Sequence, residues 1–417
     1  MNMAAKQLDP YAAEADIDSL PNYFGLPKHV RYCKKCVESN QRFMGSVPHK
    51  DQKSSTKDTI VFDDDGICGA CRYFEFKESI DWQGRERELR GLLDQHRRKD
   101  GRYDILVPGS GGKDSCFTSH LLKTKYNMNP LTVTWAPHLY TDIGWKNFQS
   151  WIHSGLDNQL YTPNGKVHRK LTRLAFENLL HPFQPFVLGQ YSYVHKVAIE
   201  KDIKLIMYGD YYPEKGVGTG IDFTKNKLDA QLFSAKQDQT LYFGGVHIDE
   251  LPEYGITKND LIPYMPADHE KIVSGNIESH CLPYYLNYDP QRCYYYAVEN
   301  CGFEANPLGR TDGTYTKYQS LDDKIDGFHY FTWFIKTGRG RATEDAALEI
   351  RNKHITRDEG IALVKKFDGE LPKTYFKEFL DYIDINEEKF WEIIDAFRSP
   401  HIWKKEGGEW KLRQPLQ

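Results

Sequence analysis

The sequence predicts an α/β fold in which a mainly parallel sheet is preceded by a four-cysteine module and followed by a helical region. Short apolar runs alternate with stretches of helical spacing between residues 104 and 208, the order typical of parallel strands joined by helices. Two C-x2-C pairs precede this part, and helix signals without strands follow it. A single core usually stops growing at about 250–300 residues, so a chain of 417 residues is expected to form two or three structural units. The sequence divides into an arm (1–30), the cysteine module with a linker helix (31–98), the α/β domain with insertions (99–342) and the helical region (343–417).

The composition is that of a folded protein without a strong charge bias. Apolar residues make up 40% of the chain and charged residues 27%, and the formal net charge is −4. A nonspecific nucleic-acid binder normally carries a basic excess, so no nucleic-acid partner is expected. The sequence has no run of 18 apolar residues, and its N-terminus lacks the apolar core of a signal peptide. We therefore expect a cytoplasmic protein with no membrane partner.

The cysteine module contains two C-x2-C pairs separated by 31 residues, namely Cys33, Cys36, Cys68 and Cys71. This spacing is typical of four thiolates around one zinc ion, and such a closed site is structural because it leaves no position for a substrate. An iron–sulfur cluster also uses four thiolates and stays an alternative. The segment between the pairs, 47–58, is polar and is expected to be a loop that the cysteines close.

The expected elements follow in chain order. An amphipathic helix is predicted over 82–96 and a buried strand over 104–108, with a helix following from Cys116. Apolar runs at 131–135, 186–188 and 205–208 are interpreted as further strands, with helical spacing between 167 and 179. The stretch 215–300 is assigned only as insertions and substrate-facing elements. Near the C-terminus, Thr356 begins a capping box for a helix ending at Phe367, and Asn386 is expected to cap the helix that includes 390–397.

A glycine-rich loop lies where the strand at 104–108 gives way to a helix. Free backbone N–H groups and the positive helix end attract an anion at such a place. The loop consists of Ser110, Gly111, Gly112, Lys113, Asp114 and Ser115. The glycines allow close approach of phosphate, the serines and Lys113 supply donors and charge, and Asp114 is the expected magnesium ligand. The pattern differs from the longer P-loop of other nucleotide-binding enzymes. We therefore predict a site for ATP with Mg²⁺.

The loop sequence resembles the signature of the PP-loop ATP pyrophosphatases. This resemblance implies cleavage of ATP into AMP and pyrophosphate. Members of that family adenylate a carbonyl or amide oxygen, and a nitrogen or sulfur nucleophile then displaces AMP.

A narrower resemblance covers the chain from Tyr32 to about Gly369. The segments 314–327, 338–343 and 354–360 are similar to the N-acetyl sugar amidotransferases of bacterial surface-polysaccharide and flagellin-sugar pathways. It implies conversion of an acetamido group on a nucleotide-linked sugar into an acetamidino group. Ammonia is expected from a glutaminase partner with a cyclase-like channel subunit, since no glutaminase centre is recognisable in this sequence. Neither the sugar nor its UDP or CMP carrier is indicated.

Further site residues are expected around the loop. A basic group able to hold pyrophosphate comprises Lys317 and Lys336, expected to be catalytic, and Arg339 and Arg341, expected to bind ATP. Because ligands bind beyond the carboxyl ends of strands in open α/β sheets, the expected substrate contacts follow two predicted strands. They are Trp135, His138, Asp142, Asp210 and Glu214. Asp322, Asp323 and Asp326 are expected to bind a second magnesium or to orient Lys317 and Lys324, with helix capping as the alternative. Asp322 and Asp323 are added to the expected substrate contacts.

Two other functions stay open at this point. An ATP-dependent tRNA sulfur transferase also joins cysteine knuckles to a PP-loop, although Cys116, Cys281, Cys293 and Cys301 contain no C-x2-C pair and the charge balance disfavours RNA. The other alternative is a zinc-ribbon interaction module with a regulatory nucleotide site. The intact pair Lys113 and Asp114 favours turnover over regulation.

Overall fold

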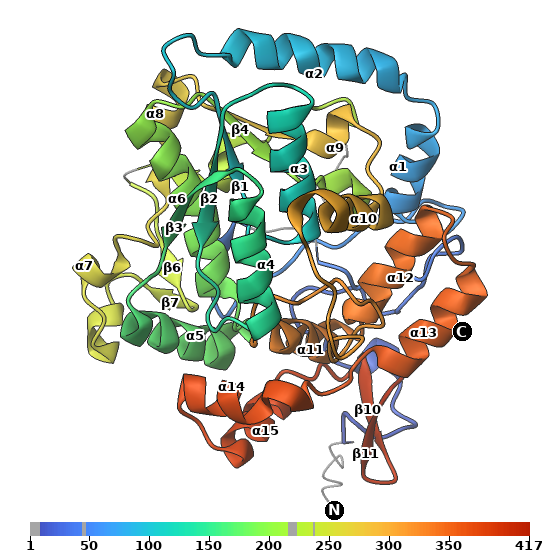
Figure 1. Cartoon of the computed structure of the whole chain (residues 1–417). Helices are drawn as coiled ribbons and strands as arrows, with labels where there is room; N and C mark the ends of the chain where they lie inside the picture. The colour runs from blue at the N-terminus through green and yellow to red at the C-terminus, as the bar shows by residue number, and fades with distance from the viewer. Residues whose placement is uncertain (1–8, 44–46, 216–222, 237) are drawn as a thin grey trace, which may run out of the picture.

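The computed structural model describes residues 9–43, 47–215, 223–236 and 238–417. A five-stranded parallel sheet lies at its centre, in the order β3-β2-β1-β4-β9 (Figure 1). Its strands are β1 (Ile105–Pro108), β2 (Pro130–Trp135), β3 (Asp157–Tyr161), β4 (Leu205–Tyr208) and β9 (Glu278–Cys281). The predicted fold class, with its parallel sheet, four-cysteine cluster and helical C-terminal region, is confirmed.

The helices surround the sheet and continue into the C-terminal region. Their bounds are α1 (Gly69–Lys77), α2 (Trp82–His96), α3 (Lys113–Thr124), α4 (Asp142–His153), α5 (Gly165–Leu179), α6 (Gln184–Lys201), α7 (Lys258–Leu261), α8 (His269–Ser274), α9 (Leu282–Tyr285), α10 (Pro290–Cys301), α11 (Asp326–Thr337), α12 (Arg341–Arg351), α13 (Arg357–Phe367), α14 (Phe376–Ile383) and α15 (Glu387–Ala396). Short 3-10 turns and two-residue strands, among them the turn Tyr212–Lys215 after β4, connect them. None of the helices described is long and apolar enough to cross a membrane.

The two faces of the sheet are buried by different helices. Successive residues of a strand point to opposite faces, so Ile105 and Val107 pack with Phe117 of α3, whereas Leu106 packs with Val194 of α6. Both faces are therefore apolar. This is why the strand sequences are continuous hydrophobic runs rather than alternating ones. The arrangement brings the start of α3 to the carboxyl end of the central strand β1.

The predicted strand at 186–188 is wrong, because these residues lie in α6. This helix is buried on several faces, so its apolar residues form a nearly continuous run like that of a central strand. The strand that follows β2 is instead β3, a polar edge strand that the apolar pattern did not indicate. The helix predicted over 82–96 is confirmed as α2.

The C-terminal region packs on the α/β part through one shared core. Phe328 of α11, Phe379 of α14 and Phe390 of α15 belong to the same buried cluster as Phe176 of α5. The capping box at Thr356 is present at the start of α13, and the side chain of Asn386 caps α15. A hairpin that the sequence reading missed follows the helices, formed by β10 (Trp403–Glu406) and β11 (Glu409–Leu412).

The N-terminal segment lies against this hairpin (Figure 1). Residues 1–8 of the predicted arm lie outside the described residues. The Tyr11 hydroxyl donates to the Arg398 carbonyl at 2.8 Å, and Arg413 donates to the carbonyls of Pro10 and Ala12 at 2.9 Å. The described part of this segment is thus held by hydrogen bonds to the last residues of the chain.

Candidate active site

The glycine loop connects β1 to α3 and needs glycine for steric reasons. Gly111 has a φ of +86°, and a Cβ atom there would lie 2.6 Å from the Cα of Phe148. A Cβ at Gly109 would lie 2.2 Å from the Cβ of Ser115. The hydroxyl of Thr134 in β2 fixes the loop by donating to the Gly109 carbonyl at 2.7 Å. The loop is therefore fixed in place, and the backbone N–H groups at the start of α3 are accessible to an anion.

Lys113 and Asp114 form a charged pair at the start of α3. Lys113 is 3% exposed, and its Nζ lies 2.6 Å from Asp114 Oδ2. The hydroxyl of Tyr288 donates to Asp114 Oδ1 at 2.8 Å. These two contacts fix the orientation of the Asp114 carboxylate. Lys113 and Asp114 therefore place one cation and one carboxylate beside the loop.

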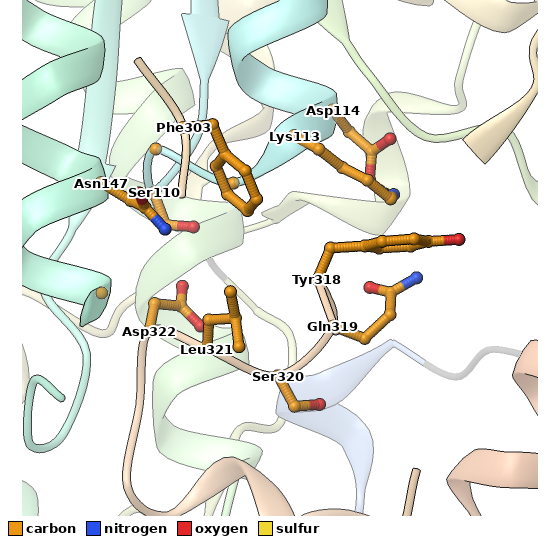
Figure 2. Close-up of a pocket in the computed structure, with 13 residues that line it drawn as sticks. Ser110, Lys113, Asp114, Asn147, Phe303, Tyr318, Gln319, Ser320, Leu321 and Asp322 are labelled. Atoms are coloured by element: carbon orange, nitrogen blue, oxygen red, sulfur yellow. The ribbon is translucent and has the colours of Figure 1, made fainter. Parts of the chain in front are cut away.

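One cavity of about 150 Å³ lies between the loop and the segment that precedes α11. Ser110, Lys113 and Asp114 line one side, and Tyr318 and Asp322 line the other (Figure 2). Burial raises the pKa of Asp322, and a hydrogen bond with Ser110 acts in the opposite direction. The predicted residue Asp322 is therefore brought to the loop.

A second cavity, of about 370 Å³, is lined by the same loop, and we call it the loop cavity. Asp210, Tyr288 and Arg341 contribute to its wall. Arg341 begins α12 and lies 3.2 Å, Nε to Oδ1, from Asp345. The predicted residues Asp210 and Arg341 therefore lie near the loop, as does Lys215, whose Nζ is 2.8 Å from Asp210 Oδ2.

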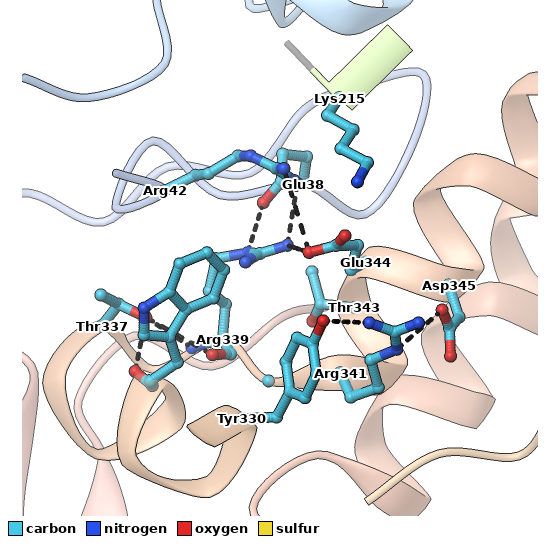
Figure 3. Close-up of polar contacts among 12 residues, drawn as sticks. Glu38, Arg42, Lys215, Tyr330, Thr337, Arg339, Arg341, Thr343, Glu344 and Asp345 are labelled. Carbon is cyan, nitrogen blue, oxygen red and sulfur yellow. Dashed lines mark hydrogen bonds and ion pairs between the residues drawn. The ribbon is translucent and has the colours of Figure 1, made fainter. Parts of the chain in front are cut away.

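Arg339 does not reach the loop, contrary to the ATP-binding role predicted for it. It is 1% exposed and lies between two carboxylates, with its Nε 2.8 Å from Glu38 Oε1 and its Nη2 3.6 Å from Glu344 Oε2 (Figure 3). Its guanidinium thereby joins the cysteine module to α12. The basic group seen in the sequence is divided, because α11 ends at Thr337 and the chain turns before α12 begins.

Lys317 and Lys336 also lie away from the phosphate loop. Lys317 lines neither loop-side cavity, and its Nζ lies 5.1 Å from the centre of the Tyr294 ring. Lys336 is 5% exposed and donates to the Leu179 carbonyl at 3.0 Å, in a different cavity. The structure therefore does not place either predicted catalytic lysine beside Lys113.

Three predicted substrate contacts belong to the packed interior. Trp135 stacks on Tyr161 with ring centres 4.9 Å apart, and the buried His138 lies 2.7 Å, Nδ1 to Oδ2, from Asp323. Asp323 also accepts from the backbone of Ile325, so it holds the entry to α11. This corrects the expected magnesium role for Asp323, because Asp323 is buried and lines neither cavity at the phosphate loop.

Asp142 and Glu214, two further predicted substrate contacts, also occupy positions where they support the fold. Asp142 begins α4, in the first turn next to its N-cap Thr141. Glu214 is 2% exposed and lies 2.8 Å, Oε1 to Nζ, from Lys77. Burial raises the pKa of Glu214 to about 7, and Lys77 acts in the opposite direction. Lys77 also donates to the Tyr288 carbonyl at 2.7 Å, so Glu214 supports the loop-side wall from behind.

The sequence reading missed several residues that line the two loop-side cavities. These are Asn147, Tyr191, Tyr212, Tyr288, Tyr318 and Gln319. Two signals in the sequence pointed toward them: the chain contains 27 tyrosines, and Tyr318 and Gln319 fall within the segment 314–327 that carries the narrower resemblance. Tyrosine joins an apolar ring to a polar tip, which suits a cleft that holds both rings and phosphates.

The four predicted metal ligands are brought together. The Sγ atoms of Cys33, Cys36, Cys68 and Cys71 lie within 4.8 Å of one another, and all four residues are buried. Cys33 and Cys71 are 3.8 Å apart and Cys36 and Cys68 3.7 Å, sulfur to sulfur. Four thiolates at tetrahedral Zn–S bonds of about 2.3 Å would be spaced by roughly 3.8 Å. The cluster therefore fits a metal ion.

Residues 312–417 match a family model described as "LPS biosynthesis protein WbpG-like, C-terminal domain". An uncharacterized protein of Methanocaldococcus jannaschii is 32% identical over 80 residues, which span 19% of this chain and 28% of that protein. The chain thus covers less than a third of that relative's length.

Two solved structures show weak similarity. For NMN synthetase from Francisella tularensis the TM-score is 0.31, with 10% identity over 66% of this chain and 94% of that chain. For the U34-tRNA thiolase NcsA from Methanococcus maripaludis with its [4Fe-4S] cluster it is also 0.31, with 13% identity over 85% and 97%.

The match to the domain family lies where the sequence motifs lie. The segments 314–327, 338–343 and 354–360, which carried the narrower resemblance, all fall inside the matched range. In the structure this range contains α12, which supplies Arg341 and Asp345 to the loop cavity. The C-terminal part of the chain is therefore similar to the C-terminal domain of WbpG-like LPS biosynthesis proteins, in agreement with the family that its motifs indicated.

Proposed function

We propose that the protein is an ATP-dependent amidotransferase that converts an acetamido group of a nucleotide-linked sugar into an acetamidino group, with release of AMP and pyrophosphate. One observation carries the proposal. Ser110, Gly112, Lys113 and Asp114 line two cavities at once. A loop that lines two cavities can hold the phosphates of ATP while a second substrate approaches the same phosphorus atom.

The residues of the loop have separate tasks in this reaction. The glycines and the start of α3 bind the phosphates, and Lys113 neutralises charge that develops on the leaving pyrophosphate. Asp114 is the residue that would hold Mg²⁺, which supplies charge neutralisation when bound. Arg341, oriented by Asp345, adds a second cation at the edge of the loop cavity.

The chemistry follows from the low reactivity of an amide. Its oxygen attacks the α-phosphate, the bond to the β-phosphate breaks and pyrophosphate leaves. Ammonia then adds to the activated carbon, AMP departs with the former amide oxygen, and loss of a proton leaves the amidine. Each substrate must be held in line with the phosphorus, and a preorganised site supplies this alignment.

Nitrogen is favoured over sulfur as the nucleophile by the state of the cysteines. Cys281 lines the loop cavity but is 2% exposed, and burial raises the pKa of its thiol well above the usual range. Burial also raises the pKa of Cys293. A thiol must ionise to carry sulfur, so neither residue suits that task. We propose a separate glutaminase subunit and a cyclase-like channel subunit as the source of ammonia.

We propose a single structural zinc ion for the four-cysteine cluster. The close spacing of the thiols supports one ion, since the thiolates of a cubane cluster each bind a different iron and lie farther apart. Metal analysis with visible absorption spectroscopy tests this directly. One equivalent of zinc and no iron is expected, whereas iron with inorganic sulfide contradicts the proposal.

The reaction is tested by incubating the protein with ATP, magnesium, ammonium and a series of UDP- and CMP-linked acetamido sugars. AMP and a product in which NH replaces the amide oxygen are expected, as measured by chromatography and mass spectrometry. If no acetamido sugar gives AMP while transfer RNA stimulates its release, the amidotransferase is wrong and the sulfur transferase is right.

A further inference from the structure

A third cavity, of about 320 Å³, adjoins the loop cavity, and we call it the side cavity. The two cavities share five wall residues, Tyr191, Asp210, Tyr212, Lys215 and Glu344. The rest of its described wall comes from Phe24, from Arg42 and Phe43, from residues between Pro48 and Lys57, from Asn178 and Leu179 at the end of α5, from His181 and Val187, and from α11. A ligand in the side cavity would therefore touch the same residues that face the phosphate loop.

The side cavity has a basic lining. Five lysine and arginine residues face three acidic ones, whereas the loop cavity has three basic and four acidic residues. A triphosphate that arrives with Mg²⁺ suits the acidic majority around Asp114. A phosphate without a metal ion suits the basic majority of the side cavity.

Lys336 is the central cation of the side cavity. It is 5% exposed, and no carboxylate among the described residues forms an ion pair with it. Its neighbours are aromatic, with Nζ 5.9 Å from the ring centre of Phe24 and 5.8 Å from that of Phe43. A buried ammonium without an anion is costly, so an anionic ligand would complete its surroundings.

A second lysine and a pair of histidines complete the lining. Lys53 is exposed on the segment between the cysteine pairs and makes no ion pair with any described residue. His181 and His329 stack with ring centres 4.9 Å apart, and the Nδ1 atom of each is buried without a hydrogen-bond partner. Tyr330 and Trp333 extend this set of flat rings along α11. Aromatic rings can stack on a nucleobase, and their unpaired polar atoms can form hydrogen bonds with it.

We propose that the side cavity binds the nucleoside phosphate part of the second substrate, with Lys336 and Lys53 on the phosphate and the aromatic rings against the base. The sugar then lies at the shared wall, where Tyr191 and Lys215 separate the two cavities, with its amide directed to the loop. This assignment rests on the proposed function, since it places the acceptor of that reaction. It also gives the four-cysteine module a role, because the segment framed by its pairs forms part of the wall.

Calorimetry with UDP and with CMP tests the side cavity directly. A nonhydrolysable ATP analogue is kept saturating so that the phosphate loop is filled. Lys336→Met and Lys53→Met are each expected to weaken nucleotide binding about tenfold or more, the value of one charge-assisted hydrogen bond. Lys50→Met is the matched control, since Lys50 is exposed in the same segment but does not line the cavity. It should leave the affinity within about twofold.

Binding and turnover together separate this inference from the proposed function. The assignment is overturned if both lysine variants keep wild-type affinity for UDP and CMP, or if inorganic phosphate binds as tightly as the nucleotides. It is also overturned if AMP forms and the KM for the nucleotide sugar is unchanged in the variants. If the variants lose nucleotide binding while wild-type protein forms no AMP with any acetamido sugar, the side cavity stands and the proposed reaction fails.

Discussion

Asp114 is held by the Lys113 ammonium and by the Tyr288 hydroxyl, and both contacts come from residues that face the phosphate loop. Such a carboxylate is positioned before any ligand binds. The contribution of Asp114 to binding a magnesium-bound triphosphate therefore depends more on its negative charge than on the shape of its side chain.

Asp114→Asn should therefore lower kcat for AMP formation by roughly 100-fold or more, the cost of losing one preorganised charged group. The amide keeps the size of the side chain, so the unfolding temperature and the metal content of the cysteine module should change little. Tyr288→Phe is the milder companion and should cost about tenfold. A variant that loses metal together with activity would indicate misfolding instead.

Lys336→Met is expected to stabilise the fold while it weakens the side cavity. Burial lowers the pKa of Lys336 from 10.5 to about 7, with Lys57 acting in the same direction and Asp51 in the opposite one. The neighbouring His181 and His329 stay neutral, since burial also lowers their pKa. Methionine removes the free-energy cost of burying the ammonium. Loss of the hydrogen bond to the Leu179 carbonyl destabilises the variant by only about 1 kcal/mol, so a net gain in stability is expected.

The gain in stability has a defined pH window. The folded-state pKa of Lys336 lies below the unfolded one, so the cost of burial is complete below pH 7 and disappears as pH rises toward 10.5. The unfolding temperature of the variant should exceed that of the wild type by more at pH 6.5 than at pH 9. A variant that is less stable at both values would show that Lys336 contributes to folding.

At the residue scale, the sequence predicted those parts of the site whose residues are neighbours in the chain. Ser110 to Ser115 were identified because adjacent residues form one turn. Tyr288 and Gln319 were not, because they reach the loop from segments about 175 and 205 positions away, and only packing decides this. Arg339 was misplaced for the same reason, since nothing near it in the sequence indicates its partner Glu38.

Among the elements, α12 connects the cysteine cluster to the cavities. Arg351 at its end lies 3.7 Å from Cys36 Sγ and donates to the Glu214 carbonyl at 3.2 Å, while its first residue Arg341 faces the loop. Distortion of the cysteine cluster, or loss of its metal, would therefore displace the turn that contains Lys215. The cluster itself therefore acts on the site through this helix, whereas the segment between its cysteine pairs lines the side cavity directly.

Cys68→Ala should remove most of the bound metal and destabilise the protein by several kcal/mol, because binding of a structural metal contributes folding free energy. Metal analysis and thermal unfolding measure both effects. Cys293→Ala is the control, since Cys293 is equally buried but lies outside the cluster. Equal metal content in the two variants would contradict the assignment of the ligands.

The element boundaries that sequence predicted well are those with strong local signals. Thr356 and Asn386 cap their helices, and α2 has one apolar stripe. Phe186 was placed in a strand because a helix buried on several sides loses its period of 3.6. The strand β3 was missed because an edge strand needs few apolar residues.

Over the whole molecule, the two ends of the chain meet. Tyr11 and Phe24 pack against residues near the C-terminus, with Phe24 stacked on Phe397 at 6.2 Å between ring centres, and Phe24 also lines the side cavity. The N-terminal segment is therefore part of the folded structure. One cavity wall depends on it.

Deletion of residues 1–30 should weaken UDP binding and leave ATP binding unchanged, because Phe24 lines the side cavity and none of the described residues 9–30 lines either cavity at the loop. Hydrogen exchange should also show faster opening of β10 and β11. Tyr11→Phe, which removes one hydrogen bond, should destabilise by about 1 kcal/mol without changing nucleotide affinity. Unchanged UDP binding after the deletion would contradict this account of the wall.

The buried pair of Glu38 and Arg339 has a consequence for synthesis of the chain. The two residues are 301 positions apart. At about 5–20 residues per second, a ribosome that has made Glu38 needs roughly 15–60 s more to make its partner. During that time Arg42, whose Nη1 lies 2.6 Å from Glu38 Oε2, can pair with this carboxylate, and the cysteine module completes its contact with Arg339 only after the chain has reached α12.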